Sequence, residues 1–517
     1  MASTRAAGHF EAMSPERERV SQPLMQPSSP TPSSATLADV VAPPLVVDLD
    51  GTLIRTDLLY ETAMRAGGRA PLKSMAAAVH LLRGKAALKS FLAEAGALDV
   101  STLPYHEECI AFLRRERARG RKIILASASD QRLVDAIAKH LELFDEVYGT
   151  GADRNLGGAA KAELLCTKYG ERGFDYIADR EVDMAVWQRA RKAFTVNASL
   201  ALRRRLESVH HDVEHIAPDG RGLGQRLTTL LNALRPHQWV KNLLIFVPIL
   251  TAHRFEPAVL LTAMLAFGLF SVVASSVYVL NDLLDLEADR RHPRKRHRPF
   301  ASGAVPIAWG MVLAPLLLGL GFGLAALTMP WQFLVALGLY YALTLSYSVW
   351  LKRHVIVDVI CLGLLYTLRI IAGGLAVAIP LSPWLLALSM FLFLSLAIMK
   401  RMAELQDARR TEREVIAGRG YEPDDLPVLQ VMGIASGYIG VLVLALYINS
   451  VTVTELYKSP TILWGTCPLL LYWISRLMMK THRGQMHDDP IVFVAKDPIS
   501  LFVGFCIVFL MFLGAYL

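Results

Sequence analysis

The sequence predicts two joined parts, an α/β domain with a parallel sheet followed by an all-α bundle of nine membrane-spanning helices. In the first half, short apolar β-prone runs alternate with helical segments, as they do in parallel α/β folds. In the second half, the apolar runs approach the roughly 20 residues that a helix needs to cross a bilayer. The chain is 53% hydrophobic and only 19% charged, which is unusual for a soluble protein and favours membrane burial.

Residues 1–43 are rich in Ser and Pro and contain few residues able to form a core, so we expect them to be disordered. They also lack the uninterrupted apolar region of a secretory signal, because the first apolar run, LVVDL at 45–49, is short and ends in acidic residues. We therefore expect the α/β domain to stay in the cytoplasm.

Residues 44–205 form the predicted α/β domain. Its strands are expected at LVVDL, KIILAS, DEVYG, DYIAD and AFTV, with a helix at 131–142. Residues 206–234 contain His, Asp and Gly and are predicted to be a linker.

Residues 235–517 form the predicted membrane domain. Its nine apolar runs are centred on 239–252, 257–280, 306–328, 331–350, 355–379, 384–401, 428–449, 460–479 and 498–517, of which the first is short. If the amino terminus is cytoplasmic, the cytoplasmic loops are rich in Lys and Arg, whereas the opposite loops hold only Arg254 and Lys458. This asymmetry is typical of membrane proteins and would be unexpected in the buried helices of a soluble one. An odd number of spans places the carboxyl terminus on the opposite side.

Charge and cysteine content exclude other classes of protein. The net charge of +8 comes mostly from cations that flank apolar spans, so we do not expect nucleic-acid binding. The five cysteines form no CxxC or Cys/His cluster, which excludes a zinc site and a disulfide scaffold.

Polar residues follow three of the predicted strands. Asp48 and Asp50 end the first strand, Ser127 ends the second, and Asp179 ends the fourth, with Asp183 one helical turn later. Lys161 stands between the last two groups. Because parallel sheets bind their ligands at the carboxyl ends of strands, these side chains should converge, whereas an isolated Asp-Gly-Thr would only be a turn.

This ordered set resembles the haloacid dehalogenase superfamily of phosphotransferases. The resemblance implies a Rossmann-like domain with a small helical cap at 55–105, in which Asp48 is the nucleophile and Asp50 the acid/base. It also implies that Thr52, Ser127 and Lys161 hold the phosphate. The implied Mg²⁺ site comprises Asp48, Asp50, Asp179, Asp183 and the Leu49 carbonyl. Arg180 departs from the family pattern, in which a small residue follows the Asp, and this puts hydrolysis in doubt.

A second acidic group lies at the cytoplasmic end of the second span. Asp282, Asp285 and Asp289 are three and four residues apart and would share one face if the helix continues. Such like charges are best explained by a divalent cation that bridges them to a diphosphate. Cations follow between Arg290 and Arg298, where they would suit phosphate oxygens or simply signal topology.

The stretch from Asn281 to Asp289, followed by RPFASG from Arg298, resembles the UbiA superfamily of intramembrane prenyltransferases, which has nine spans and an Mg²⁺-diphosphate site. Tyr347 to Arg353 also looks like a Tyr/Lys stretch of that superfamily. The second aspartate cluster, expected after the sixth span, is replaced by KRMAE at 400–404. This replacement suits a second anionic substrate.

With RPHQWVKN at 235–242, this pattern resembles the decaprenyl-phosphate phosphoribosyltransferases. That resemblance implies transfer of 5-phosphoribose from phosphoribosyl pyrophosphate to a polyprenyl phosphate in a bacterial-type inner membrane. The predicted substrate-binding residues of the membrane domain are Lys241, Asn281, Arg298, Tyr347, Lys352, Arg353, Asp358, Lys400, Arg401 and Glu404. Asp358 and Arg369 lie within a span, where they either line the lipid-phosphate cavity or pair with other helices.

We further expect the α/β domain to remove the ribose 5-phosphate from the lipid product. An aromatic prenyltransferase that uses a polyprenyl diphosphate is the alternative enzyme, and a lipid-binding or transport protein is the alternative from another class. The sequence is compatible with a homo-oligomer surrounded by membrane lipids.

Overall fold

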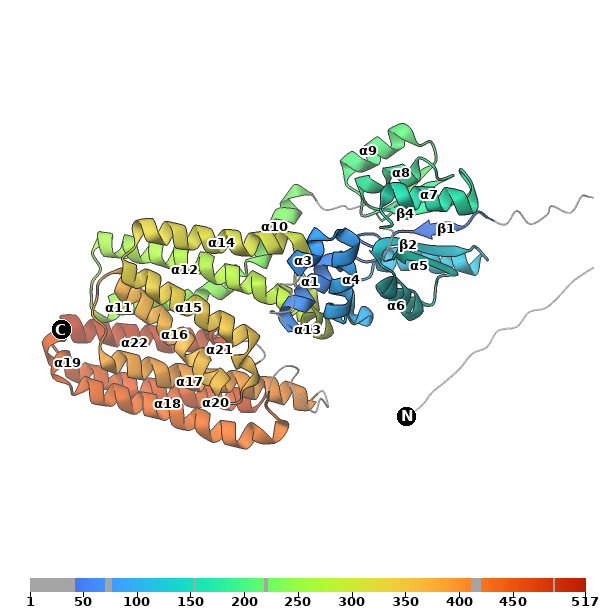
Figure 1. Cartoon of the computed structure of the whole chain (residues 1–517). Helices are drawn as coiled ribbons and strands as arrows, with labels where there is room; N and C mark the ends of the chain where they lie inside the picture. Colours follow the sequence, from blue (N-terminus) through green and yellow to red (C-terminus); the bar gives the residue numbers. More distant parts are fainter. Residues whose placement is uncertain (1–41, 70–76, 152–154, 218–221, 411–419, 487–488) are drawn as a thin grey trace, which may run out of the picture. The chain divides into compact units, whose positions relative to one another are not determined.

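The computed structural model describes residues 42–517 except 70–76, 152–154, 218–221, 411–419 and 487–488 (Figure 1). The disorder predicted for 1–43 therefore concerns residues that lie almost entirely outside the described part of the chain.

A six-stranded parallel sheet forms the centre of the soluble domain. Its strand order is β3-β2-β1-β4-β5-β6, so β1 lies inside the sheet, with Val46 opposite Ile124 on one side and Tyr176 on the other. The strands are β1 Leu45–Val47, β2 Ile123–Asp130, β3 Glu146–Thr150, β4 Asp175–Ala178, β5 Ala193–Val196 and β6 Val213–Ala217. All five strands expected from the sequence are confirmed.

Helices cover both faces of this sheet because alternate side chains of the buried strands point to opposite faces. Val47 faces a core that includes Leu113 and Val134, whereas Val46 faces a core that includes Leu165. The helices are α5 Glu107–Ala118 and α6 Gln131–Leu141 on the first face, and α7 Gly158–Tyr169, α8 Met184–Trp187 and α9 Leu200–Val209 on the second. The predicted helical cap contains α1 Leu58–Arg69, α3 Ala77–Leu82 and α4 Lys85–Gly96.

The linker predicted at 206–234 is largely ordered secondary structure. Its first part completes α9, and β6 then pairs with β5, so the sheet extends beyond residue 205. The edge strand VEHIA was missed because its half-exposed positions carry Glu and His instead of a continuous apolar run. Helix α10, Leu223–Ala233, follows before the membrane domain.

Eight described helices are long and apolar enough to cross a membrane. They are α12 Pro257–Leu284, α14 Ile307–Thr328, α15 Trp331–Val349, α16 Val357–Ala376, α17 Pro383–Arg410, α18 Leu426–Ile448, α20 Thr466–His482 and α22 Pro498–Tyr516. They correspond to the second through ninth predicted spans. Helix α16 is the most buried of them, and the α16–α18 region contributes much of the bundle core.

The first predicted span, 239–252, is not a single α-helix. A 3₁₀ helix, η3 Pro236–Phe246, leads into the short α11, Val247–Thr251. Pro248 has no N–H to donate and would clash with the carbonyl four residues earlier in a continuous α-helix. At about 2.0 Å per 3₁₀ residue and 1.5 Å per α residue, the two pieces still extend for roughly 30 Å.

This segment runs antiparallel to α12. Trp239 Nε1 donates to Ser275 Oγ at 3.0 Å, and Asn242 Nδ2 donates to Ser271 Oγ at 2.9 Å. Further along, Ile249 packs near Ala263. These contacts follow α12 from Ser275 to Ala263, which is about 18 Å along a helix that rises 1.5 Å per residue.

Candidate functional sites

The soluble domain places Asp48 directly after β1, at the carboxyl edge of the sheet. Its Oδ1 accepts a hydrogen bond from Lys161 Nζ at 2.5 Å, and Asp48 is 7% exposed. Lys161 lies in the first turn of α7 and is also buried. A buried ammonium group beside a buried carboxylate can neutralise the negative charge that a phosphoryl group brings to the nucleophile.

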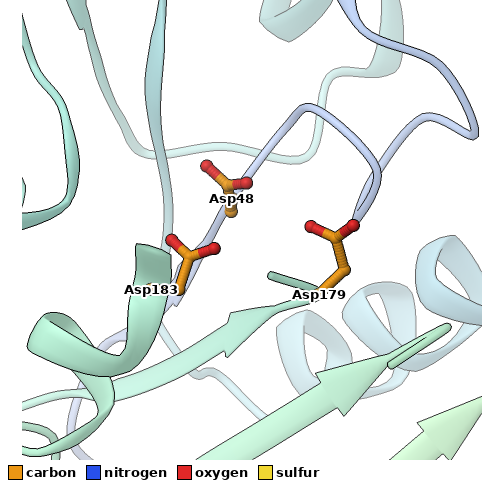
Figure 2. Close-up of side chains that lie close together, drawn as sticks. All are labelled: Asp48, Asp179 and Asp183. Carbon is orange, nitrogen blue, oxygen red and sulfur yellow. The ribbon is translucent and has the colours of Figure 1, made fainter. Parts of the chain in front are cut away.

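Asp48, Asp179 and Asp183 form an acidic cluster at this edge, with one oxygen from each lying within 4.8 Å of the others (Figure 2). Burial raises the pKa of Asp179 well above its ordinary value and the pKa of Asp183 to about 6, and the neighbouring Asp48 adds to both effects. Asp183 Oδ2 is buried and has no hydrogen-bond partner. Oxygen ligands, uncompensated negative charge and a free buried oxygen all fit a Mg²⁺ ion.

Asp50 lies outside this cluster, contrary to the ligand set expected for it. Its carboxylate accepts from Leu58 N at 2.8 Å, Ser129 Oγ at 2.7 Å and Ser127 Oγ at 3.3 Å. These bonds turn it toward β2 and the start of α1. Burial, with Asp57 and Asp48 nearby, raises the pKa of Asp50 to about 6, which suits a group that gives and takes a proton near neutral pH.

Thr52 and Arg180 both act on Asp179. Thr52 Oγ1 donates to Asp179 Oδ1 at 3.0 Å, so this hydroxyl orients an acidic side chain of the cluster. The Arg180 guanidinium is about half exposed and donates to Asp57 at 3.1 Å, and its Nε lies 3.5 Å from Asp179 Oδ2. Asp57 therefore holds the Arg180 guanidinium at the partly exposed edge of the acidic cluster.

Tyr176 is a site residue that the sequence reasoning missed. Its hydroxyl accepts from Lys161 Nζ at 2.9 Å and donates to Asp183 Oδ1 at 2.8 Å. The only signal was an aromatic residue inside a predicted buried strand, which is usually a core residue. The structure shows that it joins the lysine to the acidic cluster.

In the membrane domain, the acidic stretch does not continue one helix. Helix α12 ends at Leu284, and α13, Leu286–Arg291, starts after a break at Asp285. The expectation of three aspartates on one helical face therefore fails for Asp285, whereas Asp282 and Asp289 do come together. Arg298 Nη1 lies 2.5 Å from Asp289 Oδ2 and 3.2 Å from Asp282 Oδ1 and so joins these two carboxylates.

Each aspartate of this stretch has a basic partner. Asp282 also pairs with Arg235, whose Nε lies 3.2 Å from Oδ2. Asp285 pairs instead with Lys352 at 3.0 Å. Asn281 Oδ1 is buried without a hydrogen-bond partner, so an oxygen ligand is free beside the aspartates. This donor set also fits Mg²⁺.

Lys241 and Lys400 meet at a carboxylate that the sequence reasoning did not identify. Both ammonium groups donate to Asp489 Oδ2, at 2.8 and 2.9 Å. Asp489 lies in the loop after α20, 248 residues from Lys241 in sequence, so no local motif could reveal this contact. Burial would raise the pKa of Asp489, but Lys241 and Lys400 outweigh it and hold the pKa far below its usual range.

Arg401 and Asp358 are paired with each other. The Arg401 Nε lies 2.5 Å from Asp358 Oδ2, and both side chains are fully buried. Tyr421 donates to the other Asp358 oxygen at 2.5 Å. Arg401 also donates to Tyr347 at 2.8 Å and contacts Glu404. This network joins α16 to α17, so two predicted substrate-binding residues lie in a buried ion pair.

Arg369 and Arg353 have different surroundings. Arg369 is buried and donates to Asn242 Oδ1 at 2.9 Å, Leu365 O at 2.5 Å and Tyr340 OH at 3.1 Å. Asp358 and Arg369 thus pair with other helices, which is one of the two arrangements expected. Arg353, a predicted substrate-binding residue, is exposed.

The fold and these sites together define an integral membrane transferase with an attached phosphatase-type domain. A model described as haloacid dehalogenase-like hydrolase matches residues 45–185, and the UbiA prenyltransferase family model matches residues 243–514. The second match spans more than half of the chain, and the chain therefore belongs to the UbiA prenyltransferase family.

Curated relatives match different parts of the chain. An uncharacterized protein, y4nM, of Sinorhizobium fredii is 37% identical over 89% of each chain. Nodulation protein NoeC of Azorhizobium caulinodans is 38% identical over 53% of this chain and 89% of its own length. Decaprenyl-phosphate phosphoribosyltransferase of Mycolicibacterium smegmatis is 39% identical over 36% of this chain and 60% of its own length, so the match spans less than two thirds of that enzyme.

Two solved structures show more distant likeness. A UbiA homolog from Archaeoglobus fulgidus bound to GPP and Mg²⁺ is 15% identical, with a TM-score of 0.43 over 56% of this chain and all of its own. A substrate-bound phosphoserine phosphatase complex is 16% identical, with a TM-score of 0.25 over 36% of this chain and 97% of its own. The family models and the curated relatives identify the protein as a UbiA-type enzyme, related to decaprenyl-phosphate phosphoribosyltransferases, with a haloacid dehalogenase-like domain.

Proposed function

We propose that the membrane domain transfers 5-phosphoribose from phosphoribosyl pyrophosphate to a polyprenyl phosphate. The observation that carries this proposal is the pair of ammonium groups, from Lys241 and Lys400, that meet at the Asp489 carboxylate. An aromatic acceptor such as 4-hydroxybenzoate carries only one carboxylate charge and has less need of two ammonium groups there. Two phosphorylated substrates require cations at both ends of the site.

The aspartate side of the site is proposed to hold the donor. Asp282, Asp289 and Asn281 would bind Mg²⁺, which when bound stabilises the pyrophosphate as it leaves C1 of the ribose. Arg235 and Arg298 are already in contact with the aspartates and can turn to the remaining phosphate oxygens. The acceptor phosphate is ionised at neutral pH, so its oxygen attacks C1 without a general base.

We further propose that the soluble domain removes the 5-phosphate from this lipid. An Asp48 oxygen attacks phosphorus while the bond to the ribose oxygen breaks, and Asp50 gives that oxygen a proton. Asp50 then takes a proton from water, which attacks the aspartyl phosphate and releases inorganic phosphate. Lys161, which donates to Asp48, and Ser127, which donates to Asp50, would hold the phosphate oxygens, and the Asp48, Asp179 and Asp183 cluster would bind the Mg²⁺.

Incubation of the purified chain with labelled phosphoribosyl pyrophosphate and a polyprenyl phosphate tests the transfer reaction. A labelled lipid and free pyrophosphate should form with Mg²⁺ and disappear with a chelator. A parallel incubation uses a prenyl diphosphate with 4-hydroxybenzoate. Prenylation of the aromatic acid without ribosyl-lipid formation would assign the protein to the aromatic prenyltransferases, and pyrophosphate release in neither reaction would favour a binding or transport role.

A further inference from the structure

Two ammonium groups from distant segments share one carboxylate inside the membrane domain. Lys241 comes from η3 and Lys400 from α17, and both contact the same oxygen of Asp489. The side chains of Lys241 and Asp489 are each only 10% exposed. Two cations and one anion leave the cluster with a net positive charge, and poor access to water makes such a charge attractive to another anion.

Asp489 lies in a loop and not in a membrane-spanning helix. Its other oxygen accepts from Ile491 N at 3.2 Å and caps the short helix α21, Pro490–Val494. The contact with the lysines is thus made by the tip of one side chain. A phosphate oxygen can accept from two ammonium groups in the same way as Asp489 Oδ2 does.

The lysine pair lies close to the aspartate side of the site. Lys295, which follows α13, is partly buried and within electrostatic reach of both Asp289 and Lys400. Lys241 also lies over the ring of Tyr366, with its Nζ 5.8 Å from the ring centroid. A phosphate between the two lysines would therefore lie near a donor held by the aspartates.

We propose that Lys241 and Lys400 form a binding site for a phosphate monoester and that Asp489 sets its affinity by competing for the same two ammonium groups. This inference rests on the proposed transfer reaction. The phosphate belongs either to the lipid acceptor or to the 5-position of the ribose donor. In both cases the incoming phosphate displaces the Asp489 carboxylate, and the carboxylate returns when product leaves.

The test replaces Asp489 by Asn in the full chain, because Asn keeps the size and the helix-capping ability while removing the charge. Dissociation constants are measured separately for a short-chain polyprenyl phosphate and for phosphoribosyl pyrophosphate, together with the KM of each in the transfer reaction. Asp489→Asn should bind one of the two about tenfold more tightly, equivalent to about 1.4 kcal/mol. The substrate whose affinity changes identifies the source of the phosphate. Asp489→Ser, which also caps helices, provides a second uncharged variant.

Asp497→Asn is the matched control. Asp497 also caps a helix, and its carboxylate pairs with two cations, Arg476 and Lys480, instead of with Lys241 and Lys400. Its replacement should leave both dissociation constants unchanged. Weaker or unchanged binding of both substrates in both Asp489 variants would show that Asp489 does not compete with the phosphate for the two lysines. If the Asp489 variants bind a substrate more tightly but the wild-type protein catalyses no transfer, the phosphate site stands and the proposed reaction is wrong. If the wild-type protein catalyses transfer but the variants bind both substrates with unaltered affinity, the proposed reaction stands and the competition by Asp489 is wrong.

Discussion

At the residue scale, burial and pairing decide which cations can bind a substrate. Lys400 and Arg401 are adjacent in sequence and carry the same charge, but successive residues on a helix point about 100° apart. Arg401 points into the bundle, where Asp358 neutralises it, whereas the Lys400 side chain is 25% exposed and reaches the cluster with Lys241. One basic dipeptide thus supplies a packing residue and a candidate binding residue.

The same reasoning applies to the aspartates of the membrane domain. We predict that Asp282→Asn lowers transfer by about 100-fold, because it removes a metal-binding charge and leaves Arg235 and Arg298 with one carboxylate fewer. The rate of labelled lipid formation measures this effect over a range of Mg²⁺ concentrations. Asp48→Asn is the control and should retain transfer. The assignment of transfer to the membrane domain would be wrong if Asp48→Asn lost transfer and Asp282→Asn kept it.

At the scale of elements, the sequence pattern predicted the strands and the long spans well because each depends on local hydrophobic periodicity. The sequence pattern gave the wrong bounds or the wrong type of element at three places where hydrophobic periodicity does not determine the backbone. The first span consists of a 3₁₀ segment and a short α-helix that begins near Pro248, the helix breaks at Asp285, and the polar edge strand β6 resembles a linker. The acidic cluster of the soluble domain was predicted apart from Asp50, since strand ends converge in any parallel sheet. Tyr176 and Asp489 require tertiary contacts and had no distinctive sequence signal.

The Asp358–Arg401 pair gives a prediction about how α16 and α17 are held together. Asp358→Asn leaves a buried guanidinium without its carboxylate, which costs about 3–5 kcal/mol and should lower the unfolding temperature in detergent by roughly 5–10 °C. Glu404→Gln removes the partly exposed second partner of the same arginine and should change stability by less than about 1 kcal/mol. Equal unfolding temperatures for the wild type and Asp358→Asn would contradict a stabilising role for the pair.

At the scale of the whole molecule, loop charges and the number of crossings determine the proposed orientation. The segment 236–251 runs antiparallel to α12, and we count it as a crossing in addition to the eight long helices that the described residues contain. With a cytoplasmic amino terminus, Leu517 should then lie on the opposite side. A reporter fused after Leu517 that is active only in the cytoplasm should be silent, and the same reporter placed before Pro43 should be active. Activity at both ends would show that 236–251 does not cross.

The fusion of the two domains leads to the last prediction. The proposed transfer reaction would leave a 5-phosphate on a lipid that stays in the membrane, and an attached phosphatase would meet this product at a high effective concentration. The wild-type protein should therefore release inorganic phosphate and accumulate polyprenyl-phosphoryl-ribose. Asp48→Asn should stop at the 5-phosphorylated lipid, because no aspartyl phosphate can form without the carboxylate. Mass spectrometry of the lipids distinguishes the products, and identical lipids from both proteins in the presence of Mg²⁺ would mean that the soluble domain acts on another phosphate ester or is inactive.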